Sequence, residues 1–153
     1  ATVWQCHPLS RGSIEIQSTD PAQSPKIQPN YLAHDHDQKV MVEGVKMMRE
    51  IYHMNAFKNM WDEEVIPGPA IKTDGQILDY IRHNGGTVFH PVGTCRMGAD
   101  TASVVDPELR VRGVEGLYVA DASVMPKITS ANTNAPSLMI GEKAAHHILE
   151  HHG

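Results

Sequence analysis

A helical pattern of apolar residues is clearest in the first half of the chain, between Gln38 and about Asn55. Charged side chains occupy the opposite side of this stretch, which predicts an amphipathic helix with Asp35 or Asp37 as its cap. The apolar positions at helical spacing are Val42, Val45, Met48, Ile51 and Tyr52. One side of this helix should therefore face a core.

Two further helices are predicted from their start and stop signals. Asp74 is a good N-cap for a short helix over Gly75–Arg82, and the Asn84-Gly85-Gly86 run should end it. The last helix is predicted over Ser137–His151, with Pro136 at its beginning, where a missing N–H donor costs nothing.

Strand signals are weaker and more scattered. Alternation over Gly12–Ser18 predicts a half-buried strand, and the proline-rich stretch 18–32 predicts an extended loop. Thr87–Val92 is rich in β-formers and places His90 at a strand end or a bend. Leu117–Ala120 reads as a short buried strand.

Composition narrows the class of protein. The 153 residues carry 13 Lys and Arg against 18 Asp and Glu, a net charge of -5. Nucleic-acid binding needs a basic excess that is missing here, and no apolar run has the length of a membrane span. Cys6 and Cys95 lie far apart with no metal-ligand spacing. We expect no metal site and free thiols in a reducing, cytoplasmic compartment, with one long-range disulfide as the alternative.

Three polar residues stand where chemistry could take place. His90 can exchange a proton near neutral pH, although a lone histidine is more often structural. Asn134 lies at the start of the last helix, where it could simply cap the helix or help to favour developing negative charge. Asp121 follows the 117–120 strand, a usual position for ligand contacts, but it could equally cap a turn.

Long motifs surround these residues: FHPVGTCRMG, then VVDPELRVRGVEGLYVADASVMP, then ITSANTNAPSLMIGEKAA. In this order they resemble the C-terminal part of the glucose–methanol–choline (GMC) family of FAD-dependent alcohol oxidoreductases. The earlier PLSRGSIEIQSTDP and NYL resemble that family's substrate domain, so the resemblance covers roughly residues 8–150. Within the family the chain is most similar to alcohol and choline dehydrogenases and to aryl-alcohol or hydroxymethylfurfural-type oxidases.

The resemblance implies a catalytic pair beside a flavin. His90 matches the family's catalytic histidine, and Asn134, 44 residues later, matches a second active-site position that is histidine in other members. The implied reaction is oxidation of an alcohol substrate to an aldehyde or ketone by hydride transfer to flavin N5. In that reaction His90 is the base and Asn134 is its hydrogen-bond partner.

The resemblance also implies contacts to FAD. Asp121 and Ala122 would lie along the ribityl and pyrophosphate arm of FAD. Thr133, Asn134 and Ala135 would form a turn whose backbone approaches the flavin ring. Many relatives have Asn-Pro after that turn, where this chain has Asn-Ala-Pro.

The implied fold class is α/β (α+β), the C-terminal part of a two-domain protein with a Rossmann-like FAD-binding fold and an antiparallel-sheet substrate domain. Residues 1–86 would belong to the substrate-binding domain and residues 87–153 to the FAD-binding domain. The family's GxGxxG dinucleotide fingerprint does not occur in this sequence. We therefore expect a fragment or split subunit that works with a missing N-terminal FAD-binding portion or partner chain, and that binds FAD weakly and is inactive by itself.

Two alternatives compete with this interpretation. One is a hydroxynitrile lyase on the same fold, in which FAD is structural. The other is a non-enzymatic, His-rich metal-binding module, suggested by the 10 histidines. Its best candidate, the His-x-His pair at His34 and His36, has no third ligand nearby in the sequence.

Overall fold

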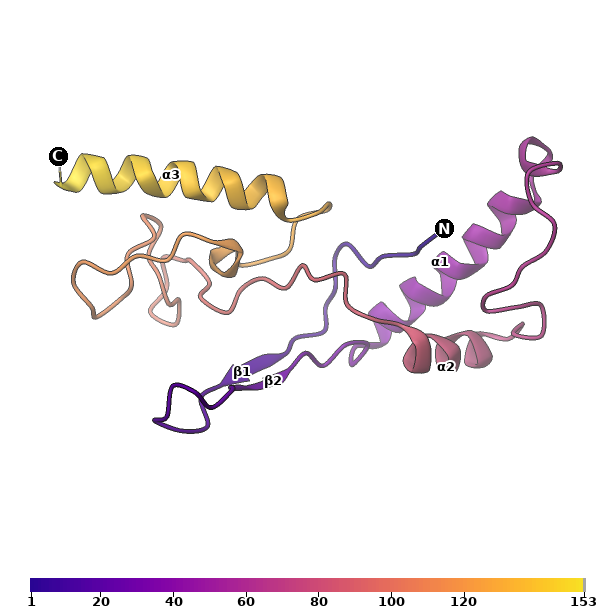
Figure 1. The fold of residues 1–153 in the computed structure, drawn as a ribbon, viewed down its shortest axis with the longest axis horizontal. Helices are drawn as coiled ribbons and strands as arrows, with labels where there is room; N and C mark the ends of the chain where they lie inside the picture. The colour runs from indigo at the N-terminus through magenta and orange to yellow at the C-terminus, as the bar shows by residue number, and fades with distance from the viewer. Residues whose placement is uncertain (153) are drawn as a thin grey trace. The chain divides into compact units, whose positions relative to one another are not determined.

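A computed structural model describes residues 1–152, the side chain of His152 excepted, and the chain divides into two compact units, 1–86 and 87–153 (Figure 1). Each unit is described by itself. None of the helices in this range is both long and apolar enough to cross a membrane.

In the first unit, helix α1 (Asp35–His53) packs on helix α2 (Asp74–Asn84). Val42 from α1 meets Ile77 and Ile81 from α2, and all three side chains are buried. Because Ile77 and Ile81 are four residues apart, they lie on one face of the helix. The short helix η1 (Asn55–Phe57) follows α1. The apolar face of α1 is confirmed, and α2 ends at the predicted Asn84-Gly85-Gly86 run, two residues beyond Arg82.

The predicted caps of these helices are wrong by a few residues. His34 caps α1 through Nδ1, which accepts the N–H two residues on at 3.1 Å. Thr73 caps α2 in a capping box, since its hydroxyl and the side chain of Gln76 each accept the other's backbone N–H. Asp35 and Asp74 are instead the first helical residues, where a carboxylate still complements the helix dipole.

Asp37 lies in the first turn of α1 and is only 2% exposed. Its carboxylate accepts the N–H groups of Leu9 at 2.9 Å and Ser10 at 2.7 Å, and also the side chains of Ser10 and Gln5. Burial alone would raise the pKa of Asp37, but these hydrogen bonds outweigh it and lower the pKa below its usual value. Through these hydrogen bonds the carboxylate holds the N-terminal segment against the start of α1.

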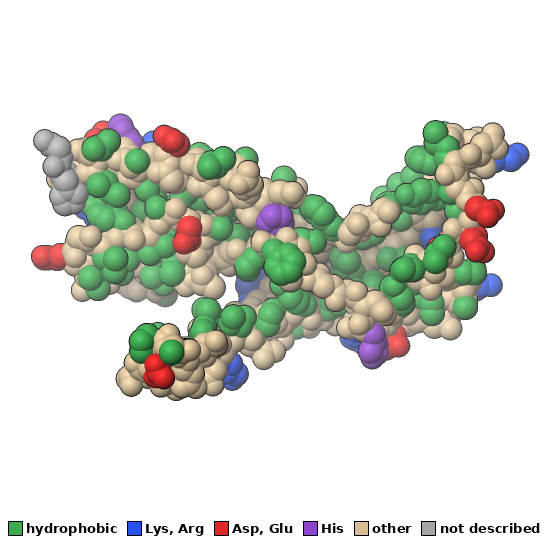
Figure 2. Space-filling model, viewed as in Figure 1, with side chains coloured by type: hydrophobic (Ala, Val, Ile, Leu, Met, Phe, Trp, Pro, Cys, Tyr) green, Lys and Arg blue, Asp and Glu red, His purple; other side chains and the backbone are tan. Residues whose placement is uncertain are grey.

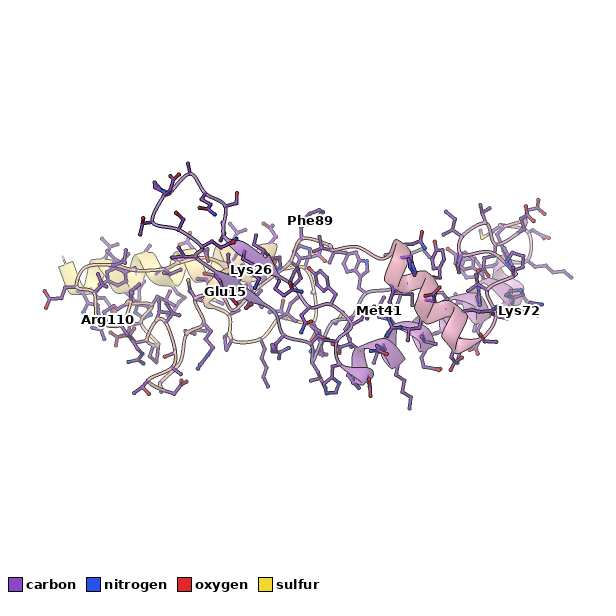
Figure 3. All side chains as sticks on the ribbon, turned by 90° about the horizontal axis from the view of Figure 1, so that it is seen from below. Glu15, Lys26, Met41, Lys72, Phe89 and Arg110 are labelled. Carbon is purple, nitrogen blue, oxygen red and sulfur yellow. The ribbon has the colours of Figure 1, made fainter. Side chains whose placement is uncertain are left out.

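The first unit also contains a two-stranded hairpin. Strand β1 (Ser13–Glu15) pairs antiparallel with β2 (Lys26–Gln28). The predicted loop is therefore wrong at β2, which forms because Pro25 and Pro29 flank the paired residues without interrupting them. Figure 3 shows the ends of the hairpin where Glu15 and Lys26 form an exposed ion pair of 3.8 Å.

The predicted half-burial of the first strand is also wrong. Ile14 is 48% exposed and its cross-strand partner Ile27 is 64% exposed. Ile16, just beyond the strand, is 90% exposed. Within the described residues the sheet has only these two strands, and every residue of both strands is exposed.

The second unit is built around helix α3 (Asn134–His152) and the short helix η2 (Ala122–Val124). In Figure 1, α3 runs alongside the turns that make up the rest of this unit. Ile140 and Ala144, four residues apart on α3, are buried against the remaining core residues. These are Val105, Leu109, Val124 and Met125.

Three predictions in the second unit are corrected. Residues 87–92 form no strand, because the backbone turns sharply at Phe89. Residues 117–120 form only a single bridge, between Tyr118 and Arg110, and Leu117 is 48% exposed rather than buried. Helix α3 begins at Asn134, three residues earlier than predicted, so Pro136 lies within its first turn.

The described residues thus combine helices with one small antiparallel sheet, which is the α+β part of the prediction. The Rossmann-like two-domain arrangement stays a prediction.

Candidate active site around His90

The backbone is strained directly before His90. Phe89 has φ of +61°, in the left-handed region, which costs an L-residue about 1–2 kcal/mol. Its N–H donates to the Thr87 hydroxyl at 3.0 Å, and its side chain is 83% exposed (Figure 3). This sharp turn leaves His90 half-buried.

The residues after His90 are held by the segment that contains η2. The N–H of Cys95 donates to the carbonyl of Ser123 at 3.0 Å, and that of Met97 donates to the carbonyl of Val124 at 2.8 Å. Two of the three motif stretches are therefore joined by backbone hydrogen bonds. Together they form a support for the loop that carries His90.

An ion pair closes the same loop. The Arg96 guanidinium donates to both carboxylate oxygens of Asp100, at 2.9 and 2.8 Å. These hydrogen bonds hold the pKa of Asp100 well below its usual range. Asp100 therefore stays ionised at neutral pH.

The central contact of the site joins His90 to Thr133. The Nδ1 atom of His90 lies 2.8 Å from the Thr133 hydroxyl oxygen, across 43 residues of sequence. Thr133 is 7% exposed, so its hydroxyl is shielded from water. The family resemblance implies only a backbone role for Thr133, so the contact of its side chain with His90 is a feature that the sequence does not predict.

Helix α3 begins immediately after this contact. The Thr133 carbonyl accepts the N–H of Ser137 at 3.0 Å and its hydroxyl at 2.6 Å, which places Thr133 at the N-cap position. Asn134 and Ala135 follow in the first turn, and both are exposed. The structure therefore brings His90 to the residue that precedes Asn134, at an exposed helix end.

Asp121 caps η2, as the turn-capping interpretation proposed. Its carboxylate accepts the N–H of Ser123 at 2.8 Å, and its side chain is otherwise exposed. Ala122 is half-buried against the core of the unit, and η2 contacts α3. Asp121 and Ala122, the residues predicted to contact the ribityl and pyrophosphate arm of FAD, thus belong to the same packed unit as His90.

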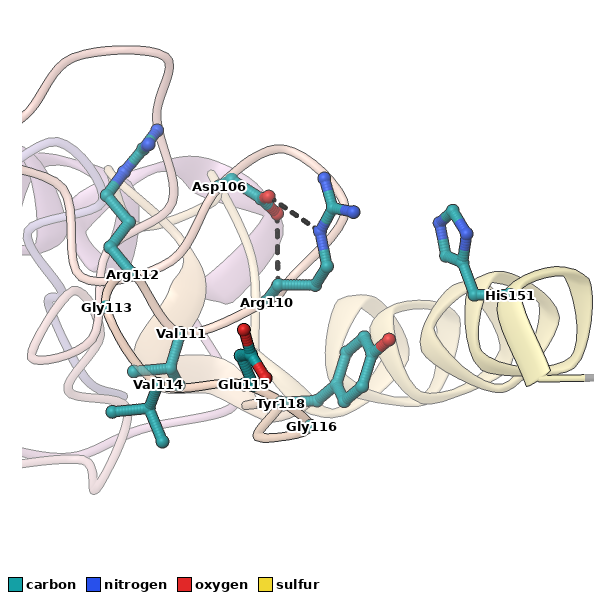
Figure 4. A pocket seen from close by; sticks show the side chains of 10 residues that line it. All are labelled: Asp106, Arg110, Val111, Arg112, Gly113, Val114, Glu115, Gly116, Tyr118 and His151. Carbon is teal, nitrogen blue, oxygen red and sulfur yellow. Dashed lines mark hydrogen bonds and ion pairs between the residues drawn. The ribbon is translucent and has the colours of Figure 1, made fainter.

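An open hollow of about 500 Å³ lies elsewhere in the second unit (Figure 4). It is formed by the turn at residues 110–118 together with Asp106 and His151. Its two arginines are already engaged, Arg110 with Asp106 and Arg112 with backbone and side-chain oxygens. None of the predicted site residues lines it, and we assign it no function.

Among the residues that the structure describes, no group of three or more His, Cys, Asp or Glu side chains is arranged to hold a metal ion. Cys6 and Cys95 are both free thiols.

With this geometry in view, comparison with known proteins identifies the family. The profile described as GMC oxidoreductase matches residues 8–141, and the chain belongs to that family.

Curated relatives agree with this assignment. The chain is 47% identical over 142 residues to an alcohol dehydrogenase (acceptor) from Pseudomonas putida, covering 93% of this chain and 26% of that protein. It is also 47% identical to an oxygen-dependent choline dehydrogenase from Brucella ovis, covering 92% of this chain and 26% of the relative. The chain thus spans about a quarter of the length of these relatives.

Solved structures show the same fold. Pyridoxine 4-oxidase from Mesorbium loti matches with a TM-score of 0.87 and 35% identity, covering 97% of this chain and 29% of the other. An FAD-dependent oxidoreductase from Chaetomium thermophilum matches with a TM-score of 0.89 and 31% identity, covering 96% of this chain and 26% of the other.

Proposed function

We propose that this chain supplies the proton-transfer residues of an FAD-dependent oxidoreductase that oxidises the CH–OH group of an alcohol to an aldehyde or ketone. The contact between His90 and Thr133 carries the proposal, because it brings the imidazole to the helix end where Asn134 stands. The names of the alcohol and choline dehydrogenases that the chain resembles support the choice of substrate class.

The two side chains would act on one substrate oxygen. His90 accepts the hydroxyl proton through Nε2, the ring nitrogen that does not face Thr133. Asn134 donates an amide hydrogen bond to the same oxygen and fixes its direction. A general base contributes typically about 10²–10⁴-fold to the rate. FAD, when bound, accepts the hydride that leaves the substrate carbon.

The residues present fit an FAD by their chemistry. Asn134 and Ala135 lie exposed in the first turn of α3, where backbone N–H groups lack intrahelical acceptors and the helix dipole is positive. Such an end suits a ring that gains negative charge on reduction. Thr133 would contribute backbone there, and Asp121 and Ala122 would contact the arm of the cofactor.

The exposed surface supports a larger assembly. Two separate globular units of these sizes would together expose roughly 9,300 Å². The chain exposes 11086 Å², and Figure 2 shows apolar side chains on the visible surface of both units. We infer that residues 1–86 serve as part of a substrate-binding domain and residues 87–153 as part of an FAD-binding domain. The flavin-binding portion of the enzyme would cover their exposed apolar side chains.

The test is reduction of the flavin by an alcohol. This chain would be expressed joined to a flavin-binding portion, for example that of the Pseudomonas putida relative, and mixed with primary alcohols without oxygen. The flavin absorbance should bleach, and His90→Ala should slow bleaching by about 10²–10⁴-fold, with a smaller loss for Asn134→Ala. Equal, small effects of both changes would reject these roles. Cleavage of a cyanohydrin without any bleaching would instead identify a lyase.

A further inference from the structure

We propose that Thr133 is a positioning residue whose hydroxyl accepts a hydrogen bond from Nδ1–H of His90, leaving the Nε2 lone pair free for the substrate proton. The inference rests on the proposed role of His90 as a base. It concerns the side chain of Thr133, whereas the family resemblance implied only its backbone.

The contact is well placed for this task. The distance from Nδ1 to the hydroxyl oxygen is 2.8 Å, and Thr133 is 7% exposed, so water competes poorly for its hydroxyl. The Thr133 backbone is held by two hydrogen bonds from Ser137 to its carbonyl. Its β-branched side chain has few rotamers. The hydroxyl oxygen of Thr133 is therefore held in one position, where it can orient the imidazole ring of His90.

A neutral imidazole carries one proton, and the partner of one nitrogen decides which nitrogen holds it. A hydroxyl can donate or accept, but only the tautomer with its proton on Nδ1 leaves Nε2 able to accept another. When His90 takes up the substrate proton, the Nδ1–H bond becomes charge-assisted and strengthens. The hydroxyl thus stabilises the state after proton transfer more than the state before it, which is the condition for faster reaction.

The position of Thr133 adds a second consequence. Thr133 directly precedes Asn134 at the start of α3, so one helix end orients both the imidazole and the amide. A shift of this helix end would move both groups together.

The test compares two substitutions of Thr133 in the flavin-loaded enzyme that carries this chain. Thr133→Val keeps the shape and removes the hydroxyl, while Thr133→Ser keeps the hydroxyl. We expect Val to slow flavin reduction by about 10- to 100-fold, the range for a hydrogen bond to a charged group, with little change in the KM for the alcohol. Ser should stay within about threefold of the wild type.

A second readout does not depend on turnover. In protein labelled with ¹⁵N-histidine, the ring nitrogen signals of His90, assigned by their loss in His90→Gln, report which nitrogen is protonated. The wild type and the Ser variant should show Nδ1–H, and the Val variant should show a mixture of tautomers. If Val binds less flavin, rates are compared per bound flavin, and the tautomer ratio decides.

Three outcomes separate the hypotheses. A Val variant with normal rate and unchanged tautomer overturns this inference. A Ser variant as impaired as Val also overturns it, because packing rather than the hydroxyl would then matter. If His90→Ala itself reduces flavin at a normal rate, the proposed function fails and not only the role of Thr133.

Discussion

Ser10 donates two hydrogen bonds to one oxygen of Asp37, from its N–H at 2.7 Å and from its hydroxyl at 2.5 Å. The two residues lie 27 positions apart, so this contact closes the N-terminal segment onto the first turn of α1. Asp37 is the charged residue among the fully buried side chains of the described chain. It should contribute strongly to the stability of the first unit.

We expect Asp37→Asn to lower the free energy of unfolding by about 1.5–3 kcal/mol. Both oxygens of the carboxylate accept hydrogen bonds, whereas an amide has one oxygen that accepts and one NH₂ group that can only donate. Urea unfolding of the protein at neutral pH would measure the loss. Asp35→Asn is the matched control, since Asp35 is exposed in the same helical turn. Equal losses in the two variants would contradict the structural role of Asp37.

The same carboxylate predicts an acid-sensitive contribution. The pKa of Asp37 is lowered in the folded chain, so the folded state binds fewer protons than the unfolded state near and below pH 4. Its stabilisation is fully present above the unfolded pKa of about 3.9 and is lost as pH falls through the lowered folded pKa. The difference in melting temperature between wild type and Asp37→Asn should therefore shrink as the pH falls below about 4. A difference independent of pH would contradict this.

Two helical glycines should respond oppositely to alanine. A Cβ at Gly75 in α2 would meet nothing within 4 Å, so Gly75→Ala should stabilise by up to about 1 kcal/mol. A Cβ at Gly44 in α1 would overlap the branched side chain of Val3, so Gly44→Ala should destabilise by displacing that segment. Thermal unfolding of the two variants in parallel tests the prediction, and a gain at Gly44 would refute the packing of Val3.

Phe89 should show the cost of its backbone conformation. Phe89→Gly and Phe89→Ala both remove an exposed ring, but only glycine adopts φ of +61° without strain. The Gly variant should therefore be more stable than the Ala variant by about 1 kcal/mol. Chemical denaturation of both variants measures this difference. Equal stability would mean that position 89 is not strained in the folded protein.

The purified 153-residue chain should bind FAD weakly or not at all, since the family's fingerprint for the ADP half is not in this sequence. Titration followed by flavin fluorescence and by gel filtration would measure the affinity. Tight, stoichiometric FAD in this chain would contradict the inference that a flavin-binding portion must join it.

Local signals in the sequence are enough to predict where the helices lie. The apolar spacing in α1 and the glycines after α2 act over one or two turns, where hydrogen bonds join residues four apart. The motifs around His90 and Asn134 were also sufficient to recognise the family. The observed helix caps lie one to three residues from the predicted ones, because several neighbouring side chains could cap each helix, as Thr73 and Asp74 show.

Only the tertiary structure decides which residues form strands and which side chain contacts His90. Residues 87–92 and 117–120 have the composition of strands, but a strand needs a partner that the local sequence does not specify. The burial of Asp37 and the exposure of Ile16 likewise depend on what covers them. The hydroxyl of Thr133 contacts His90 only because the chain between them folds back through η2, to which the residues after His90 are hydrogen-bonded. Sequence determined which side chains could do chemistry, and packing decided which of them meet.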